Sequence, residues 1–309
     1  MTRQSAHAPI VLVDASGVAI EVGSISSFTS VEGSPYAGIR ARTLSLRERF
    51  RFHGLDPRNS QSLTRILDMT DSMWDSWNRG AKDEITFPHL WAAAHAERIT
   101  TAALSAPRGQ SSGYLFRDLL KGSLDLLGRT QSKAKDTLWE LELLGILVSH
   151  DIDAAPGEPD LSVRFFGAPV GFACKKIYSE RNVSKVLSNA VAQIEREGRF
   201  GIIALNLDDL LPANTILRAQ TMSDMTAILA ERNYAFLRTH ERNLRRYLTP
   251  GRAISVLVSS GTIADVENAK NRFLNARQTT VWQIPGIPEA KAEQMNKFLS
   301  AMSAQYYRA

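Results

Sequence analysis

Residues 158–179 read EPDLSVRFFGAPVGFACKKIYS, and the expected fold rests on this stretch. Two apolar runs, at 161–166 and 170–178, flank a Gly-Ala-Pro tripeptide at 167–169. Apolar runs separated by Gly and Pro are typical of two strands joined by a turn. We therefore expect a hairpin in which Asp160 opens the first strand and the second strand runs back beside it.

The second strand of this hairpin carries the residues of chemical interest. Because side chains alternate along a strand, Ala173 and Lys175 share one face, while Cys174 and Lys176 take the other. An aspartate, Asp160, and a lysine thus meet at a paired strand edge. Hard divalent cations prefer oxygen ligands, and lysine offsets phosphate charge. The pattern predicts a site for a divalent cation and a phosphate.

The elements around the hairpin indicate an α/β fold with a mixed sheet flanked by helices. A helix is expected at 132–147, and it carries Glu140 and Glu142. An amphipathic helix is expected at 182–197, after the hairpin. The remaining expected strands are 201–207, 253–259 and 279–284, and the remaining expected helices are 222–247, 263–275 and 287–306.

The first third of the chain follows a different pattern. Short apolar stretches within 8–32 suggest a strand pair or an ordered arm, and the spacing from 45 to 106 is mainly helical. The segment PRGQSSG at 107–113 is typical of a linker. We predict a mainly helical N-terminal domain that binds substrate or a partner (1–112), a core domain (113–285) and a C-terminal helix (286–309).

Composition, charge and the absence of some common motifs limit the classes to which this protein can belong. The 309 residues carry a net charge of +5 with a sequence pI of about 9.4, a modest hint of a polyanionic partner. One cysteine, Cys174, excludes an internal disulfide. No run approaches the length of a membrane helix, so we expect a soluble, cytoplasmic protein. The sequence has no Walker loop, no GxSxG and no GxGxxG that opens a helix, so a serine hydrolase and a nucleotide-binding protein gain no support from motifs.

The order of these residues resembles the PD-(D/E)xK superfamily of nucleases, which have a restriction-endonuclease-like core. The resemblance rests on Pro159-Asp160, a hairpin, and Ala-Cys-Lys at 173–175, where Glu-Cys-Lys is a common form of the motif. Glu140 resembles the acid of the preceding helix, and Gln193 resembles a glutamine of the following helix. The match covers about 113–285.

The resemblance implies a role for each residue. Asp160 would be the main ligand of Mg²⁺ or Mn²⁺, Glu140 a supporting ligand, and the main-chain carbonyl of Cys174 would complete the metal's ligands. Lys175 would contact the attacking water and the phosphate. Gln193 would lie near the metal site or contact DNA.

One position departs from the motif, because Ala173 stands where the superfamily has an acidic residue, and alanine cannot bind a metal. Two explanations fit. The alanine is a deliberate replacement of Glu or Asp that traps an inactive complex, or the natural site is degenerate or recruits Glu140 or Glu142 instead.

Two groups of basic residues are candidates for contact with DNA. Arg238, Arg242, Arg245 and Arg246 lie on neighbouring faces of one expected helix, and Lys176 lies near the hairpin. The second group is five arginines between positions 40 and 51. The alternative for both groups is an ordinary solvated surface.

The sequence therefore predicts a metal-dependent endonuclease that hydrolyses DNA, with a role in bacterial defence or repair, and with activity weakened or lost through Ala173. DNA is the expected partner, and a homodimer or a protein partner is a further expectation. The main alternative is a catalytically dead protein of the same fold that binds nucleic acid or a protein. A third is an α/β enzyme that acts on a small molecule.

Overall fold

In the computed structural model, the described part of residues 35–149 forms five helices, and the rest of the described chain forms one large sheet with three more helices. The described residues are 2–6, 10–13, 19–29, 35–109, 112–165, 168–197, 200–248, 253–269, 273–283 and 289–303.

The elements have the following bounds. The helices are α1 (Pro35–Phe52), α2 (Gln61–Asn78), α3 (Phe87–Ser105), α4 (Gly113–Leu119), α5 (Lys133–Ser149), α6 (Val183–Arg196), α7 (Met222–Leu248) and α8 (Glu289–Ser303). The strands are β1 (Thr2–Ala6), β2 (Ile10–Val13), β3 (Ala19–Thr29), β4 (Asp153–Pro156), β5 (Leu161–Phe165), β6 (Ala168–Lys176), β7 (Phe200–Asn206), β8 (Leu217–Ala219), β9 (Ala253–Val266) and β10 (Phe273–Trp282).

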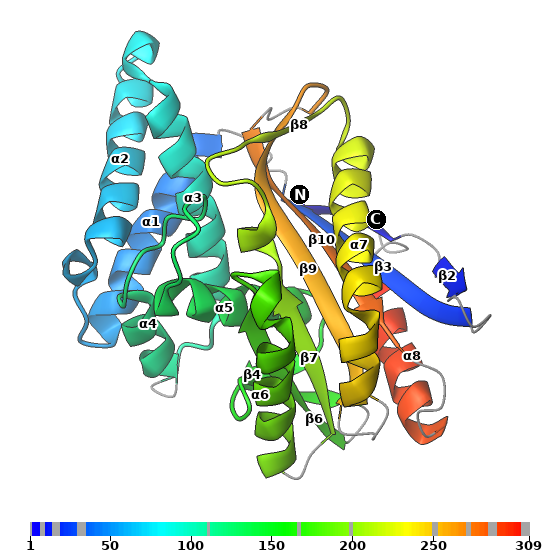
Figure 1. Cartoon of the computed structure of the whole chain (residues 1–309). Coiled ribbons are helices and arrows are strands. Elements are labelled where there is room, and N and C mark those ends of the chain that lie inside the picture. The colour runs from blue at the N-terminus through cyan, green and yellow to red at the C-terminus, as the bar shows by residue number, and fades with distance from the viewer. Residues whose placement is uncertain are drawn as a thin grey trace.

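The sheet is mixed and strongly twisted (Figure 1). Its strand order is β1-β3-β10-β9-β7-β6-β5-β4, with β2 added beside β3 and β8 beside β9. The expected hairpin is present, because β5 and β6 pair antiparallel with Leu161 opposite Phe172. Strand β6 then runs parallel to β7, and β7 parallel to β9. The carboxyl ends of these three strands therefore point the same way.

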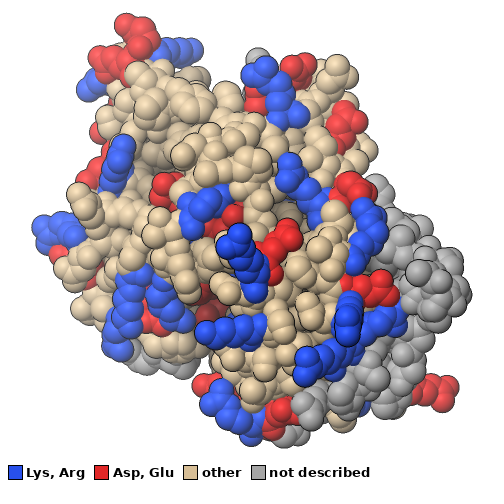
Figure 2. Space-filling model, in the orientation of Figure 1, with Lys and Arg blue, Asp and Glu red and all other residues tan. Residues whose placement is uncertain are grey.

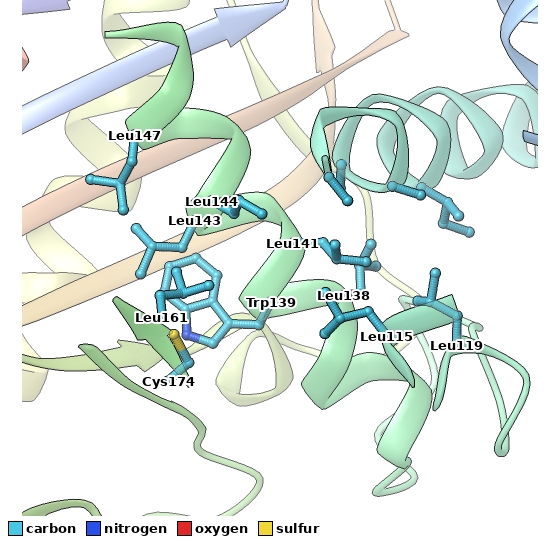
Figure 3. Close-up of a cluster of buried hydrophobic side chains, with 14 of the residues drawn as sticks. Leu115, Leu119, Leu138, Trp139, Leu141, Leu143, Leu144, Leu147, Leu161 and Cys174 are labelled. Carbon is cyan, nitrogen blue, oxygen red and sulfur yellow. The ribbon is translucent and has the colours of Figure 1, made fainter. Parts of the chain in front are cut away.

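Helix α5 holds the sheet and the helical layer together. Nearly all of its side chains from Ala134 to Leu144 are buried, including the charged Lys135, Glu140 and Glu142. Figure 3 shows Trp139 lying against Leu161 and Cys174 of the hairpin, while Leu138 and Leu141 turn toward α4. The indole Nε1 of Trp139 donates a hydrogen bond to the Ala204 carbonyl at 3.0 Å. Helices before residue 112 and strands after it thus share one hydrophobic core.

The other face of the sheet is covered by α6 and α7, which lie side by side in Figure 1. The expected amphipathic stripe of α6 is confirmed, since Leu187, Ala190 and Ile194 are fully buried against β6 and β7. Trp282 of β10 joins the same cluster. The hairpin therefore packs against α5 on one face of the sheet and against α6 on the other.

The expected helix at 263–275 is wrong. Residues 263–266 continue β9, and 273–275 begin β10, which pairs antiparallel with β9 from Phe273 to Trp282. The segment holds good helix formers such as Ala264, Glu267 and Ala269, but inter-strand hydrogen bonds and burial of the whole of β9 outweigh their local propensity. Residues 166–167, part of the expected strand and turn, lie outside the described residues. Residues 168–169 belong to β6.

The N-terminal segment is also part of the large sheet. Strand β3 pairs antiparallel with β10, with Thr279 opposite Ile25. Strand β2 pairs with β3, which agrees with the strand pair expected within 8–32, and β1, which lies before that range, also pairs with β3. The region 1–112 thus contributes strands to the core sheet as well as the helices α1–α3.

Candidate functional site

Asp160 lies at the entrance of β5 and is held by the neighbouring strand. Its Oδ2 accepts a hydrogen bond from the Cys174 main-chain N–H at 2.7 Å and another from the Lys175 ammonium at 2.7 Å. Lys175 Nζ also donates to the Cys174 carbonyl at 3.0 Å. The structure therefore brings together the carboxylate, the ammonium and the main-chain carbonyl that the sequence placed at one strand edge.

Glu140 approaches this cluster from α5. It is 8% exposed, and burial, followed by the charge of Asp160, raises its pKa to about 7. Lys133 Nζ, 3.7 Å from Glu140 Oε1, and Lys175 partly offset this effect. The two carboxylates are thus close enough to repel each other, and the local positive charge does not fully compensate them.

Ala173 is completely buried in the core cluster beneath α6, with Leu187 and Ala190. Its side chain shares a strand face with Gly171 and Lys175. A Cβ at position 171 would come within 2.6 Å of Pro159 Cδ, so this face is turned toward the Pro159-Asp160 turn. Position 173 therefore points to the side from which Asp160 approaches, but its methyl group leaves no acid there.

Cys174 contributes only its main chain to the cluster. Its side chain is 6% exposed and packs on the α5 side beside Trp139 and Leu161 (Figure 3). Burial, then the charges of Asp160 and Glu140, raises the pKa of the thiol. The thiol is thus a core group, as alternation along the strand predicted.

Gln193 is not brought into direct contact with the cluster. It lies on α6, partly buried, and within the described residues its Oε1 has no hydrogen-bond partner. It belongs to the helix that covers position 173, so its expected role near the site stays a prediction.

Sequence reasoning missed three residues beside the site. Lys133 Nζ lies 3.7 Å from both Glu140 Oε1 and Asp118 Oδ2, and so bridges α5 and α4. Tyr114 of α4 is 43% exposed; burial and then the charges of Glu140 and Asp160 raise its pKa to about 12. Lys133 precedes Glu140 by seven residues, which is about two helical turns, so both lie on the same face of one helix. This spacing is the sequence signal that could have predicted the pair. Tyr114 and Asp118 follow a segment that reads as a linker and gave no such signal.

The described residues fall short of a full metal site. No group of three or more His, Cys, Asp or Glu side chains among them is arranged to hold a metal ion. Asp160 and Glu140 supply two carboxylates, and the Cys174 carbonyl is a third oxygen. These donors are of the type that Mg²⁺ prefers, and Ala173 adds no oxygen to them.

Lys176 does not belong with the residues expected to contact DNA. Its side chain is 5% exposed, and its ammonium lies 2.7 Å from both Asp209 Oδ2 and Asn206 Oδ1. To reach a phosphate backbone, the Lys176 ammonium would have to leave Asp209. The Asp209 carboxylate would then stay buried without its partner. The expectation for Lys176 is therefore wrong.

Lys176 is part of a larger set of buried charges at the carboxyl ends of β6 and β7. Glu142, Asp208 and Asp209 are its acids, and Arg98, Lys135, Lys176 and Arg277 are its bases. We refer to these seven residues as the buried charge network. Glu142, like Glu140, is buried although it is charged.

The surface arginines differ in how far acids neutralise them. On α7, Arg238 pairs with Glu231 at 2.5 Å and Arg245 with Glu241 at 2.8 Å, while Arg242 and Arg246 are exposed. Figure 2 shows Lys and Arg side chains spread over the lower part of the face that α6 and α7 present.

The arginines of α1 are mostly engaged inside the helical layer. Arg42 and Arg47 pair with acids of α3 and α2, respectively, and Arg40 pairs with Asp71. Arg49 is buried and donates to the carbonyls of Ala106 and Pro107. This group is therefore a weaker candidate for contact with DNA than α7.

Comparison with known proteins identifies no relative: no family model, curated protein or solved structure matches the chain. Within the described residues, no helix is long and apolar enough to cross a membrane.

Proposed function

We propose that this chain is a nuclease-fold protein of the PD-(D/E)xK type, with a restriction-endonuclease-like core that binds DNA and a phosphodiester site that lacks one acid. One observation carries the proposal: Lys175 Nζ lies 2.7 Å from Asp160 Oδ2, beside the Cys174 carbonyl, while Glu140 approaches from the preceding helix. An acidic helix, a hairpin with Asp and Lys at its edge, and a following helix occur in the order that the resemblance implies.

Each residue of the site would have its own role in phosphodiester hydrolysis. Lys175 places a positive charge between a carboxylate and a carbonyl, where it can hold a phosphate oxygen or orient the attacking water. Tyr114 stays protonated at neutral pH because its pKa is about 12, so its hydroxyl can donate a hydrogen bond to a phosphate oxygen.

Asp160, Glu140 and the Cys174 carbonyl are the groups that would hold a divalent cation. Bound Mg²⁺ or Mn²⁺ would stabilise the negative charge that develops on the phosphate. The raised pKa of Glu140 supports this assignment, because a second positive charge would relieve the repulsion between the two carboxylates.

A second candidate function is nucleic-acid or protein binding by a catalytically dead member of the same fold. Position 173 favours it, since the alanine is fully buried in the cluster beneath α6 and contributes no oxygen. The two candidates share the fold and the basic surface, and they differ only in whether a third acid restores hydrolysis.

The decisive experiment places an acid at position 173. Ala173→Glu should cleave plasmid or single-stranded DNA with Mg²⁺ or Mn²⁺ at least about a thousandfold faster than the unaltered chain, corresponding to about 4 kcal/mol at about 1.4 kcal/mol per tenfold. The matched control is Ala173→Gln, which introduces nearly the same volume without the charge and should stay inactive. Adding Asp160→Ala or Lys175→Ala to Ala173→Glu should abolish the gain.

Other outcomes would decide between the candidates. If Ala173→Glu keeps its circular dichroism spectrum and binds DNA but stays inert, the dead-nuclease function is the better account. If the unaltered chain already cuts briskly with metal, Glu140 supplies enough of the missing charge, and the lack of an acid at position 173 does not limit hydrolysis.

A further inference from the structure

A cavity of about 910 Å³ lies in the helical part of the molecule, away from the phosphodiester site. Its walls come from the start of α2, the start of α3, the loop between α4 and α5, and the segment before β8. None of the site residues Asp160, Glu140 or Lys175 lines it. The volume lies within the range of about 300–1,000 Å³ that is typical of small-molecule sites.

One wall of the cavity is aromatic. The rings of Phe87 and Trp91 lie 5.7 Å apart at their centroids, and those of Trp91 and His95 lie 5.3 Å apart. Phe87 is 53% exposed, so part of this wall is open to a ligand. Ile66 and Met69 of α2 add an apolar surface. A planar aromatic group, such as a nucleobase, can stack here.

The His95 ring in this wall is uncharged. Its Nδ1 lies 2.9 Å from the Trp91 carbonyl, and its Nε2 accepts the Leu126 N–H at 3.2 Å. Only a neutral ring can make both bonds, because it donates at one nitrogen and accepts at the other. Burial lowers the pKa of His95 to about 4, so the ring stays neutral at physiological pH.

Other residues that line the cavity are polar. Arg65 of α2 is exposed, and within the described part of the chain it forms no ion pair. Hydroxyl, amide and carboxylate groups of Ser123, Asn214 and Asp125 line the cavity as well. The Asp125 side chain is 54% exposed, and its Oδ1 accepts the Leu127 N–H at 3.0 Å. The lining thus combines hydrogen-bond donors and acceptors with one cation that the described residues leave without an ion pair.

The cavity is held open by contacts between its loops. Arg129 donates to the carbonyls of Leu211 at 2.7 Å and Pro212 at 2.6 Å. The Asn214 N–H donates to the Leu127 carbonyl at 3.3 Å. A ligand would therefore meet an already ordered wall, which lowers the entropy cost of binding.

We propose that this cavity binds a nucleotide, whose base stacks on Phe87 and Trp91 and whose phosphate faces Arg65. A base is planar and carries both donors and acceptors at its edge, which matches the aromatic wall and the mixed amide, hydroxyl and carboxylate groups. A guanidinium is the side chain best suited to a phosphate, since it can form two parallel hydrogen bonds. The nucleotide is either free or one unit of a bound strand.

The test measures nucleotide binding by the full chain. Calorimetric titrations use AMP, GMP, CMP and UMP, each beside its unphosphorylated nucleoside, and fluorescence titrations use a single-stranded oligonucleotide that contains 2-aminopurine. Arg65→Gln should weaken binding of the monophosphates by about tenfold or more and leave nucleoside binding unchanged. Phe87→Ala should weaken both. The matched control is Arg79→Gln at the end of the same helix, because Arg79 pairs with Glu84 outside the cavity, and it should change neither.

The two sources of the nucleotide give different results. Monophosphate binding that depends on Arg65 would show a site for free nucleotides. A 2-aminopurine signal that depends on Phe87 and Arg65, without monophosphate binding, would show a site for a base within a strand. Binding of neither probe, or equal effects of Arg65→Gln and Arg79→Gln, would overturn the proposal. DNA cleavage by Ala173→Glu is a separate readout, so this result does not depend on the phosphodiester site.

Discussion

Glu140 and Glu142 lie two residues apart on α5, and both are buried, yet their surroundings differ in the balance of charge. Glu142 Oε2 accepts from Arg98 Nη2 at 3.0 Å and from Arg277 Nη2 at 2.8 Å. Glu140 has Lys133 at 3.7 Å as its ion-pair partner and faces the charge of Asp160. Because Arg98 and Arg277 also pair with Asp208, Glu142 belongs to a balanced set of two acids and two guanidinium groups, while Glu140 is repelled by Asp160.

The pKa values of the two regions move in opposite directions. In the buried charge network, burial alone would raise the pKa of Asp208, but the charges of Arg277 and Arg98 hold it well below its ordinary value. Around Asp160, burial and the charge of Asp160 raise the pKa of Glu140 to about 7. Balanced buried charges fasten α3, α5 and β10 together. Unbalanced acids at an edge leave room for a cation, and this difference is why we place the function at Glu140.

The strongest test of this comparison replaces each glutamate by glutamine. Glu142→Gln should lower the free energy of unfolding by about 3–5 kcal/mol, because it leaves two buried guanidinium groups short of an anion. Glu140→Gln should change it by less than about 1 kcal/mol, since it loses one long ion pair to the half-exposed Lys133 and relieves the repulsion from Asp160. Urea unfolding of both variants gives the two values, and equal losses would remove the distinction between the regions.

A smaller effect should appear in the pH dependence of stability. The network cations Arg98 and Lys135, after burial, help to lower the pKa of His95 to about 4 from its ordinary value of 6.5. Between these values the unfolded chain binds a proton that the folded chain does not, so stability falls as the pH drops below 6.5. The loss should reach about 2 kcal/mol at pH 5.

The control for this slope comes from the same helix. His95→Gln removes the titrating group and should lack this part of the pH dependence, whereas replacing the partly buried His89, whose ring caps the same helix, by Gln should keep it. Urea unfolding at pH 5, 6 and 7 measures the slopes. A slope that is the same in all three proteins would mean that His95 is not held neutral by its surroundings.

The smallest effect concerns the surface of α7, where Arg242 and Arg246 are exposed to solvent. Replacing Arg242, Arg245 and Arg246 by Ala should weaken DNA binding and flatten its salt dependence by about one unit of slope for each lost phosphate contact. Arg79→Ala, which removes a paired arginine far from α7 in sequence, should leave the slope unchanged. A salt titration with the same slope in every variant would show that α7 does not contact the phosphate backbone.

The local sequence was sufficient where a short-range rule applies. Alternation along a strand placed Lys175 and Ala173 on one face and sent the Cys174 side chain into the core, and the hairpin brought Asp160 beside them. The apolar stripe of α6 likewise follows from helical spacing. Local propensity failed at 263–275, because inter-strand pairing across β9 and β10 is a non-local interaction.

The sequence by itself determined that an aspartate, a lysine and a glutamate-bearing helix would be neighbours, and that position 173 would lack an acid. Only the tertiary structure decided that Glu140 faces Asp160 while Glu142 is held by Arg98 and Arg277, and that Lys176 is paired and buried. Helical and strand periodicity fix which residues share a face. They carry no information about which distant charge that face meets, because the partners come from α3, β10 and the turn after β7, whose positions are set by packing of the whole core.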